Sequence, residues 1–274
     1  MILFDSHTHL ESPRYNADRE EVICRAVSAG VTRMISCGSD LATSRQNVAL
    51  ATKYKSVYAA VGVHGHEASS AFALAETEVA NGGQVPIDQV VEEVIVEIAA
   101  LAQELKVVAI GEIGLDYHYQ FSPRPAQRAV LARQLALACA LELPVILHNR
   151  ESDEDLRRLV DAVPGPLRGV LHCFMADERM AIWALDRGLY IGIAGPITFR
   201  NVAHLPDVVR RIPLDRLLIE TDSPWLAPHP QRGRRNEPAY VRHIAERLAE
   251  ILNLSPEVVA ARTTENACRL FGVA

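Results

Sequence analysis

The opening segment of the chain carries two histidines, His7 and His9, at the end of a short apolar run. Residues two apart on a β-strand point to the same side, so the two imidazoles are expected to converge on one point. A short apolar run is typical of a buried parallel strand, which places the pair where that strand leaves the core. Such a pair can begin a metal site, although an isolated His-x-His is weak evidence for one.

Four later apolar runs also lead into a residue that is able to bind a metal. In chain order these residues are Glu112 after 107–111, His148 after 144–147, His172 after 169–171 and Asp222 after 217–221. If the strands are parallel, their C-terminal ends share one rim, where four imidazoles and two carboxylates then meet. A single such residue could equally be a solvated side chain at a strand end. Five apolar runs that each lead into a metal-binding residue favour a common site.

This ligand set exceeds the needs of one tetrahedral zinc, because a catalytic zinc usually takes three protein ligands and a water. We therefore expect two divalent metal ions. His7, His9 and Asp222 are assigned to one ion, His148 and His172 to the other. Glu112 is assigned to both as the bridge, since no lysine of the chain follows an expected strand.

Two ions about 3.5–4 Å apart would lower the pKa of a shared water and hold both oxygens of a displacement reaction. The expected chemistry is hydrolysis by a two-metal-activated hydroxide, with Glu112 and Asp222 as the catalytic carboxylates. Asp222 is the expected proton shuttle because it would touch both the ion and the water. These ligand types do not distinguish zinc, manganese, magnesium, iron, nickel and cobalt.

The segments that must position these residues alternate between strand and helix. Three further β-rich runs at 31–37, 57–63 and 189–194 bring the expected strands to eight. Helical patterns are expected at 19–29, 41–53, 90–105, 127–141, 153–163, 178–187 and 202–211, and Ser255-Pro256 begins a final helix. Such alternation predicts an α/β fold with a parallel sheet, closed as a (β/α)8 TIM barrel, whose active site lies at the C-terminal strand ends.

Composition limits the other possibilities. The 274 residues are 49% hydrophobic and 23% charged, as in an ordinary globular protein, and residues 1–274 are expected to form a single hydrolase domain. We find no membrane-spanning stretch and no signal peptide, so a cytoplasmic protein is expected. A net charge of −6 gives no overall attraction to nucleic acid, and any such contact must be local. The oligomeric state is not indicated.

Several segments occur in a characteristic order: FDSHTHL, GVHGH, GEIGLDYH, LPVILHNRES, LHCF, YIGIAGPITF and IETDSPWLAPHPQRGRRNEPAYV. Over nearly the full length they resemble the TatD family of metal-dependent deoxyribonucleases, in the amidohydrolase-like superfamily. The resemblance implies a two-metal phosphodiesterase in a TIM barrel, often an exonuclease on DNA and sometimes on RNA. Its metal ligands match His7, His9, Glu112, His148, His172 and Asp222. Gly65 stands where the family usually has proline, and the interval before Gly111 is longer than usual; both departures bear on polymer specificity.

The resemblance also implies that His66 and the arginine-rich loop bind phosphate. Arg232, Arg234 and Arg235 follow Asp222 closely enough to stand over the same rim, and guanidinium groups match phosphate oxygens bidentately. A solvated loop is the alternative for these arginines. His66 follows an expected strand and is the histidine of GVHGH that we expect in the site.

Alternative functions stay open at this point. A binuclear hydrolase of a small ester, lactone, amide or aminoacyl ester would use the same fold and metals, which do not fix the bond that is cleaved. A non-catalytic metal-binding or nucleic-acid-binding module would not need so complete a ligand set. Residues 67–105 are expected to form either a lid or a surface excursion followed by the regular barrel helix.

Overall fold

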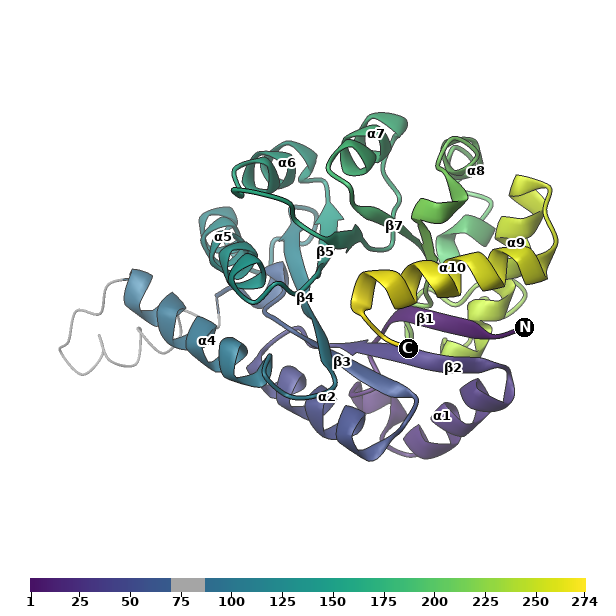
Figure 1. Cartoon of the computed structure of the whole chain (residues 1–274), viewed down its shortest axis with the longest axis horizontal. Helices are drawn as coiled ribbons and strands as arrows, with labels where there is room; N and C mark the ends of the chain where they lie inside the picture. Colours follow the sequence, from purple (N-terminus) through teal and green to yellow (C-terminus); the bar gives the residue numbers. More distant parts are fainter. Residues whose placement is uncertain (70–86) are drawn as a thin grey trace.

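The computed structural model of the chain describes residues 1–69 and 87–274. Eight parallel strands stand in the order β1 to β8, and a parallel bridge between Thr8 and Ser223 joins the last strand end to the first. The strands are β1 (Leu3–Thr8), β2 (Val31–Cys37), β3 (Val57–Val61), β4 (Val107–Asp116), β5 (Val145–Arg150), β6 (Gly169–Leu171), β7 (Tyr190–Ile193) and β8 (Leu217–Ile219). This is the predicted (β/α)8 TIM barrel (Figure 1).

Helices surround the sheet, as Figure 1 shows. They are α1 (Arg19–Ser28), α2 (Leu41–Lys53), α4 (Ile87–Leu101), α5 (Arg124–Ala140), α6 (Asp153–Asp161), α7 (Glu178–Asp186), α8 (Leu205–Val209), α9 (Val241–Leu252) and α10 (Pro256–Phe271). Short 3-10 turns are η1 (Pro13–Tyr15), η2 (Gly65–Glu67), η3 (Gly195–Thr198), η4 (Leu214–Arg216) and η5 (Pro238–Tyr240).

Local sequence signals explain where several helices begin. Asp40 and Thr43 form a reciprocal capping box at the start of α2. Asp177 caps α7 by accepting a hydrogen bond from the Met180 amide, and Ser255 caps α10 just before Pro256. These caps satisfy amides that would otherwise lack partners, so the helices start at fixed residues.

One helical prediction needs correction, and one helix was missed. The helix expected at 202–211 is only Leu205–Val209, because Pro206 is tolerated only in a first turn. Helix α9 was not predicted. Helix α4 packs against α2 and α5 as an ordinary outer helix, while residues 70–86 of the interval considered as a lid lie outside the described residues.

The core has two layers. One fills the space between the sheet and the outer helices. The other fills the barrel with inward side chains such as Phe4, Ile146 and Leu218, and it continues into Leu270 and Phe271 of α10. Helix α10 crosses one end of the barrel in Figure 1, against the start of β1. That packing closes the N-terminal mouth and leaves the other mouth for chemistry.

Two strands carry an extra residue at the open mouth. Asp5 to Thr8 in β1 spans three steps opposite two steps from Met34 to Ser36 in β2. Ile110 to Ile113 in β4 likewise spans three steps opposite two from Val145 to Leu147 in β5. Such bulges change the direction in which a side chain points and are frequent beside active sites. His7 lies in the first bulge and Glu112 in the second. Among the helices of residues 1–69 and 87–274, none is long and apolar enough to cross a membrane.

Candidate metal centre

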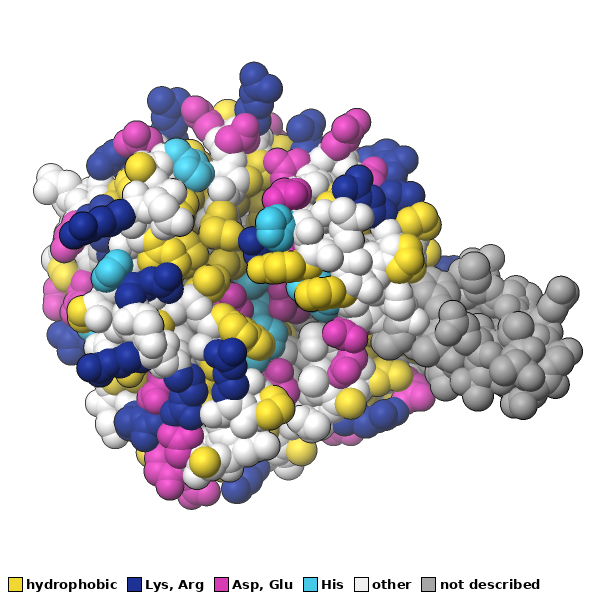
Figure 2. All heavy atoms as spheres, turned by 180° about the vertical axis from the view of Figure 1, so that it is seen from behind, with side chains coloured by type: hydrophobic (Ala, Val, Ile, Leu, Met, Phe, Trp, Pro, Cys, Tyr) yellow, Lys and Arg dark blue, Asp and Glu magenta, His cyan; other side chains and the backbone are white. Residues whose placement is uncertain are grey.

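The structure brings all six predicted ligands together at the open mouth, with Glu112 in the middle. Glu112 Oε1 lies 2.9 Å from His148 Nδ1 and 2.9 Å from His172 Nε2. Glu112 Oε2 lies 3.4 Å from His7 Nε2 and 3.5 Å from His9 Nε2. One carboxylate therefore faces imidazoles from three different strand ends. In Figure 2, which views this side of the molecule, histidine side chains gather in a hollow.

Asp222 completes the side of the cluster that holds the first two histidines. Its Oδ1 lies 3.8 Å from His7 Nε2 and 3.6 Å from His9 Nε2. Its amide donates to the His7 carbonyl at 3.0 Å, and the His9 amide donates to the Ser223 carbonyl at 2.8 Å. These backbone bonds fix the end of β1 against the segment that follows β8, so the three side chains converge as one group.

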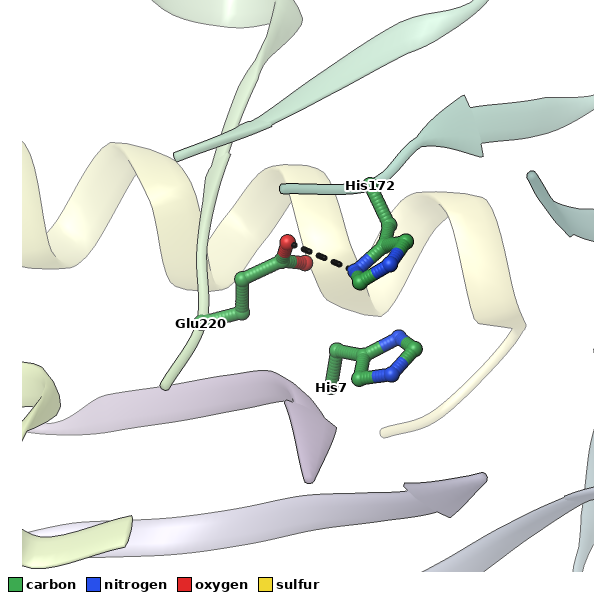
Figure 3. A group of neighbouring side chains, drawn as sticks. All are labelled: His7, His172 and Glu220. Atoms are coloured by element: carbon green, nitrogen blue, oxygen red, sulfur yellow. Dashed lines mark ion pairs between the residues drawn. The ribbon is translucent and has the colours of Figure 1, made fainter. Parts of the chain in front are cut away.

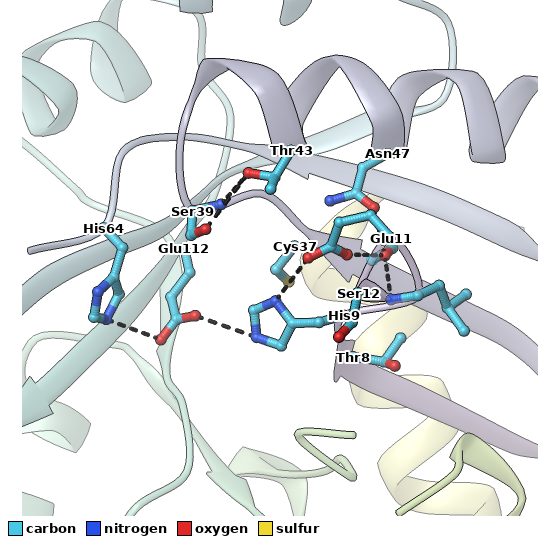
Figure 4. A network of polar contacts seen from close by, with 12 residues as sticks. Thr8, His9, Glu11, Ser12, Cys37, Ser39, Thr43, Asn47, His64 and Glu112 are labelled. Carbon is cyan, nitrogen blue, oxygen red and sulfur yellow. Dashed lines mark hydrogen bonds and ion pairs between the residues drawn. The ribbon is translucent and has the colours of Figure 1, made fainter. Parts of the chain in front are cut away.

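A histidine that the sequence did not assign to the centre, His64, also reaches Glu112. Its Nε2 lies 3.4 Å from Glu112 Oε1, and the residue is buried (Figure 4). His64 follows β3 and forms a candidate ligand group with Glu112 and His148. The sequence carried a signal for His64 as a ligand, because it follows an apolar run just as His148 and His172 do.

Buried carboxylates stand behind two of the histidines. Glu11 Oε1 lies 3.4 Å from His9 Nδ1 (Figure 4). Glu11 Oε2 accepts a hydrogen bond from Ser36 Oγ at 3.2 Å. Glu220 Oε1 lies 3.3 Å from His172 Nδ1 (Figure 3). A carboxylate at the far nitrogen of an imidazole sets its orientation and raises its basicity as a ligand.

His66, predicted to bind phosphate, stands at the edge of this cluster. Its Nε2 lies 2.8 Å from Asp116 Oδ2, which also lies 3.3 Å from His148 Nε2. Asp116 was not singled out in the sequence. It is buried at the end of β4, and its other oxygen accepts the amides of His118 and Tyr119 at 2.9 Å each. A fixed carboxylate thus connects His66 to the candidate ligand His148.

Electrostatics favour an ionised centre. Burial alone would raise the pKa of Glu112, but the surrounding His172, His64 and His7 hold that pKa well below its usual range. Burial also acts to raise the pKa of Asp222, and a hydrogen bond with His9 and the charges of His172 and His7 lower it on balance. Desolvation lowers the pKa of His64 to about 4, so this imidazole is neutral and able to ligate at neutral pH.

The donor set fits divalent cations. Nε2 atoms of His7 and His9 face each other at 3.1 Å, and five imidazoles lie within 3.5 Å of the one carboxylate Glu112. Within the described residues the buried Nδ1 of His172 makes no hydrogen bond, although Glu220 is at ion-pair distance. Crowded, buried imidazole nitrogens and carboxylate oxygens are ligands for zinc, manganese, iron, nickel or cobalt.

Comparison with known proteins agrees with this geometry. The family described as TatD related DNase matches residues 4–272. The chain belongs to the TatD family. The Bacillus subtilis protein named "uncharacterized metal-dependent hydrolase YabD" is 40% identical over 99% of this chain and 100% of its own length. The Salmonella typhimurium "3'-5' ssDNA/RNA exonuclease TatD" is 36% identical over 99% of both.

Solved structures give the same result for the fold. The TatD homologue YJJV from Escherichia coli k12 superposes with a TM-score of 0.83 at 28% identity, covering 99% of this chain and 98% of that one. An amidohydrolase from Saccharomyces cerevisiae superposes with a TM-score of 0.84 at 19% identity, covering 99% of this chain and 100% of that one. The second match shows the fold alone. The expected family and barrel are thereby confirmed.

The arginine-rich loop of this TatD family member places its three guanidinium groups differently. Arg235 binds Asp18 through two hydrogen bonds of 2.7 Å and Glu237 through one of 3.0 Å. Arg232 is exposed and lies over the Phe199 ring, 4.0 Å from its centroid. Arg234 is exposed and contacts the Gln231 side chain at 3.4 Å. Two of the three arginines therefore present charge to solvent, and the third is neutralised by carboxylates.

Proposed function

We propose that this chain is a divalent-metal-dependent hydrolase that cleaves phosphodiester bonds of single-stranded DNA or RNA, acting as an exonuclease. The observation that carries the proposal is the buried carboxylate Glu112 with five imidazole nitrogens within 3.5 Å. A relative spanning the full chain bears the name of an ssDNA/RNA exonuclease, which supports this substrate class.

Seven residues would hold the metal. In this proposal His7, His9 and Asp222 would hold one ion, and His148 and His172 would hold a second. Glu112 would contribute to both, and His64 lies close enough to join the second group. When bound, such a pair of ions supplies a nucleophilic water of lowered pKa and positive charge for the phosphoryl oxygens.

The chain's own residues supply proton transfer and orientation. Asp222 is the more exposed of the two central carboxylates, at 15% against 7% for Glu112. Its lowered pKa keeps it ionised at neutral pH, so it is able to orient a water and accept its proton. His66, Arg232 and Arg234 are proposed to bind substrate phosphates. Arg235 is proposed instead to hold the loop in place, because it is paired with Asp18 and Glu237.

The test is a substrate panel with metal-depleted protein. Each metal is added back separately, and cleavage is followed on 5'-labelled single-stranded DNA, single-stranded RNA and blunt duplex, with p-nitrophenyl acetate and a lactone alongside. We expect metal-dependent shortening of the single strands, loss of cleavage with excess chelator, and close to two ions per chain by elemental analysis. Turnover of the small ester or lactone, with intact oligonucleotides, would favour the alternative hydrolase instead. Full oligonucleotide cleavage after verified metal removal would contradict the proposal.

A further inference from the structure

Two aromatic side chains stand exposed beside the candidate metal centre. Tyr119 is 50% exposed and Phe121 is 68% exposed. Their rings are stacked, with centroids 5.4 Å apart and planes only 6° from parallel. Covering the apolar surface of an exposed aromatic ring with a ligand is energetically favourable. A further flat ring of a ligand can also stack on a pair of parallel rings.

The position of this pair is fixed relative to the centre. The Tyr119 amide donates to Asp116 Oδ1 at 2.9 Å, and Asp116 Oδ2 contacts both His66 and His148. The His66 ring meets Phe121 edge to face at 4.9 Å and Tyr119 at 5.7 Å. A group held against these rings would therefore lie next to the residues that are proposed to bind the reacting phosphate.

Positive charge accompanies the rings. The Arg150 guanidinium lies over Tyr119, 4.8 Å from the ring centroid, and Arg150 also lines a cavity of about 490 Å³ together with Met175 and Ala176. The cavity's acidic side chains have partners: Glu151 is 2.6 Å from His118 Nδ1, and Asp153 accepts from Asn149 at 2.6 Å. The combination of an arginine with flat apolar faces suits a base that carries a phosphate.

We propose that Tyr119 and Phe121 form a stacking platform for an unpaired nucleobase, with Arg150 as its cationic flank. This inference rests on the proposed function and specifies how the strand is held. Bases inside a duplex already stack on both faces, so the platform accepts only a base of a single strand or an unpaired end. Stacking on aromatic side chains is worth about 1–3 kcal/mol per base, or about five- to 150-fold in affinity.

The test compares two oligonucleotides that differ by one base. The first is an ordinary labelled single strand, and the second carries an abasic nucleotide, scanned through the three positions nearest the cleaved end. Affinity is measured by fluorescence anisotropy in the Asp222→Asn background, and kcat and KM are measured in the otherwise unchanged protein. The variants are Phe121→Ala, Tyr119→Ala and Tyr119→Phe. Leu105→Ala is the matched control, because Leu105 is 96% exposed and precedes β4 at the opposite end of that strand.

We expect Phe121→Ala and Tyr119→Ala to weaken binding of the ordinary strand by about five- to 150-fold and to raise KM more than they lower kcat. Tyr119→Phe should keep wild-type affinity. With the abasic nucleotide at one scanned position, the loss caused by the alanine variants should shrink to less than about twofold.

Equal losses on ordinary and abasic strands would overturn the platform, as would wild-type affinity in both alanine variants. Phe121 is mostly exposed, so its variant remains informative even if Tyr119→Ala folds poorly. Failure of the proposed function is distinguishable, because the wild-type chain would then neither bind nor cleave the ordinary oligonucleotide.

Discussion

Glu220 and Glu11 support different sides of the centre, which makes their separate removal informative. Glu220 lies 3.3 Å from His172 Nδ1, and Glu11 lies 3.4 Å from His9 Nδ1. His172 belongs to the second proposed ion and His9 to the first. We therefore predict that Glu220→Gln weakens only the second ion and Glu11→Gln only the first.

The size of the effect of Glu220→Gln depends on which interactions of the carboxylate the glutamine amide retains and which it loses. Glu220 Oε1 accepts the Cys173 amide at 2.5 Å and Oε2 accepts Ser6 Oγ at 3.1 Å. A glutamine oxygen can still accept the hydrogen bond from the Cys173 amide, and the glutamine NH2 can face the Ser6 hydroxyl. The free energy of unfolding should therefore fall by no more than about 1 kcal/mol. The negative charge behind the imidazole is lost, and removal of such a partner typically costs about 10–100-fold in metal affinity.

The assay is a competition titration against a fluorescent metal chelator, which resolves two binding steps. Each variant should weaken one step by about 10–100-fold, equal to about 1.4–2.7 kcal/mol, and leave the other unchanged. Glu237→Gln is the matched control, since this buried carboxylate binds Arg25 and Arg235 away from the centre. Wild-type affinities in both variants, or weakening of the same step by both, would refute the reasoning.

Three further predictions concern single side chains. Asp222→Asn should retain the fold but lower kcat by several orders of magnitude, because an amide cannot accept the proton; near-normal kcat would remove Asp222 from this role. In an Asp222→Asn background, Arg234→Ala should flatten the log-affinity versus log-salt slope for an oligonucleotide by about 0.7–0.9, whereas Arg235→Ala should mainly lower the unfolding midpoint in urea. Asp18 has its pKa lowered from 3.8 to about 2, first by its hydrogen bonds with Arg235, so its stabilisation is complete above pH 3.8 and is lost as pH falls toward 2. Asp18→Asn should therefore cost up to about 1 kcal/mol in urea unfolding at pH 7 and little at pH 2, and a pH-independent difference would contradict this.

The ligands could be predicted from sequence because each one follows or ends a short apolar run, although β4 and β5 continue past Glu112 and His148 to Asp116 and Arg150. Strand ends of a parallel barrel share a rim, so position along the chain translates directly into position in space. The direction of each side chain was less predictable. Phe4 points into the barrel, and simple alternation would turn Ser6 and Thr8 inward after it; the extra residue between Asp5 and Thr8 brings His7 and His9 to the centre instead.

Charge partners from distant segments were beyond prediction. The run Arg232-Gly233-Arg234-Arg235 has the same composition whether it is free or paired. Asp18, which neutralises Arg235, is 217 residues away in the chain. Exposure of Tyr119 and Phe121 was equally hidden, because aromatic residues after a strand pack inward more often than they remain in solvent.

Glu220 shares a strand face with the ligand Asp222, two residues away, and the sequence alone suggests an arginine partner or a direct catalytic role for it, whereas its contact is His172. Glu220 follows β8, and the histidine it contacts follows β6, so its carboxylate must pass β7. Gly192 of β7 leaves that path open: a Cβ there would come within 2.7 Å of Glu220 Oε2. The histidine, the carboxylate and the glycine belong to three different strand segments, so no single segment of the sequence reveals the contact. A ligand is specified by one strand end, whereas its support is specified by the packing of three.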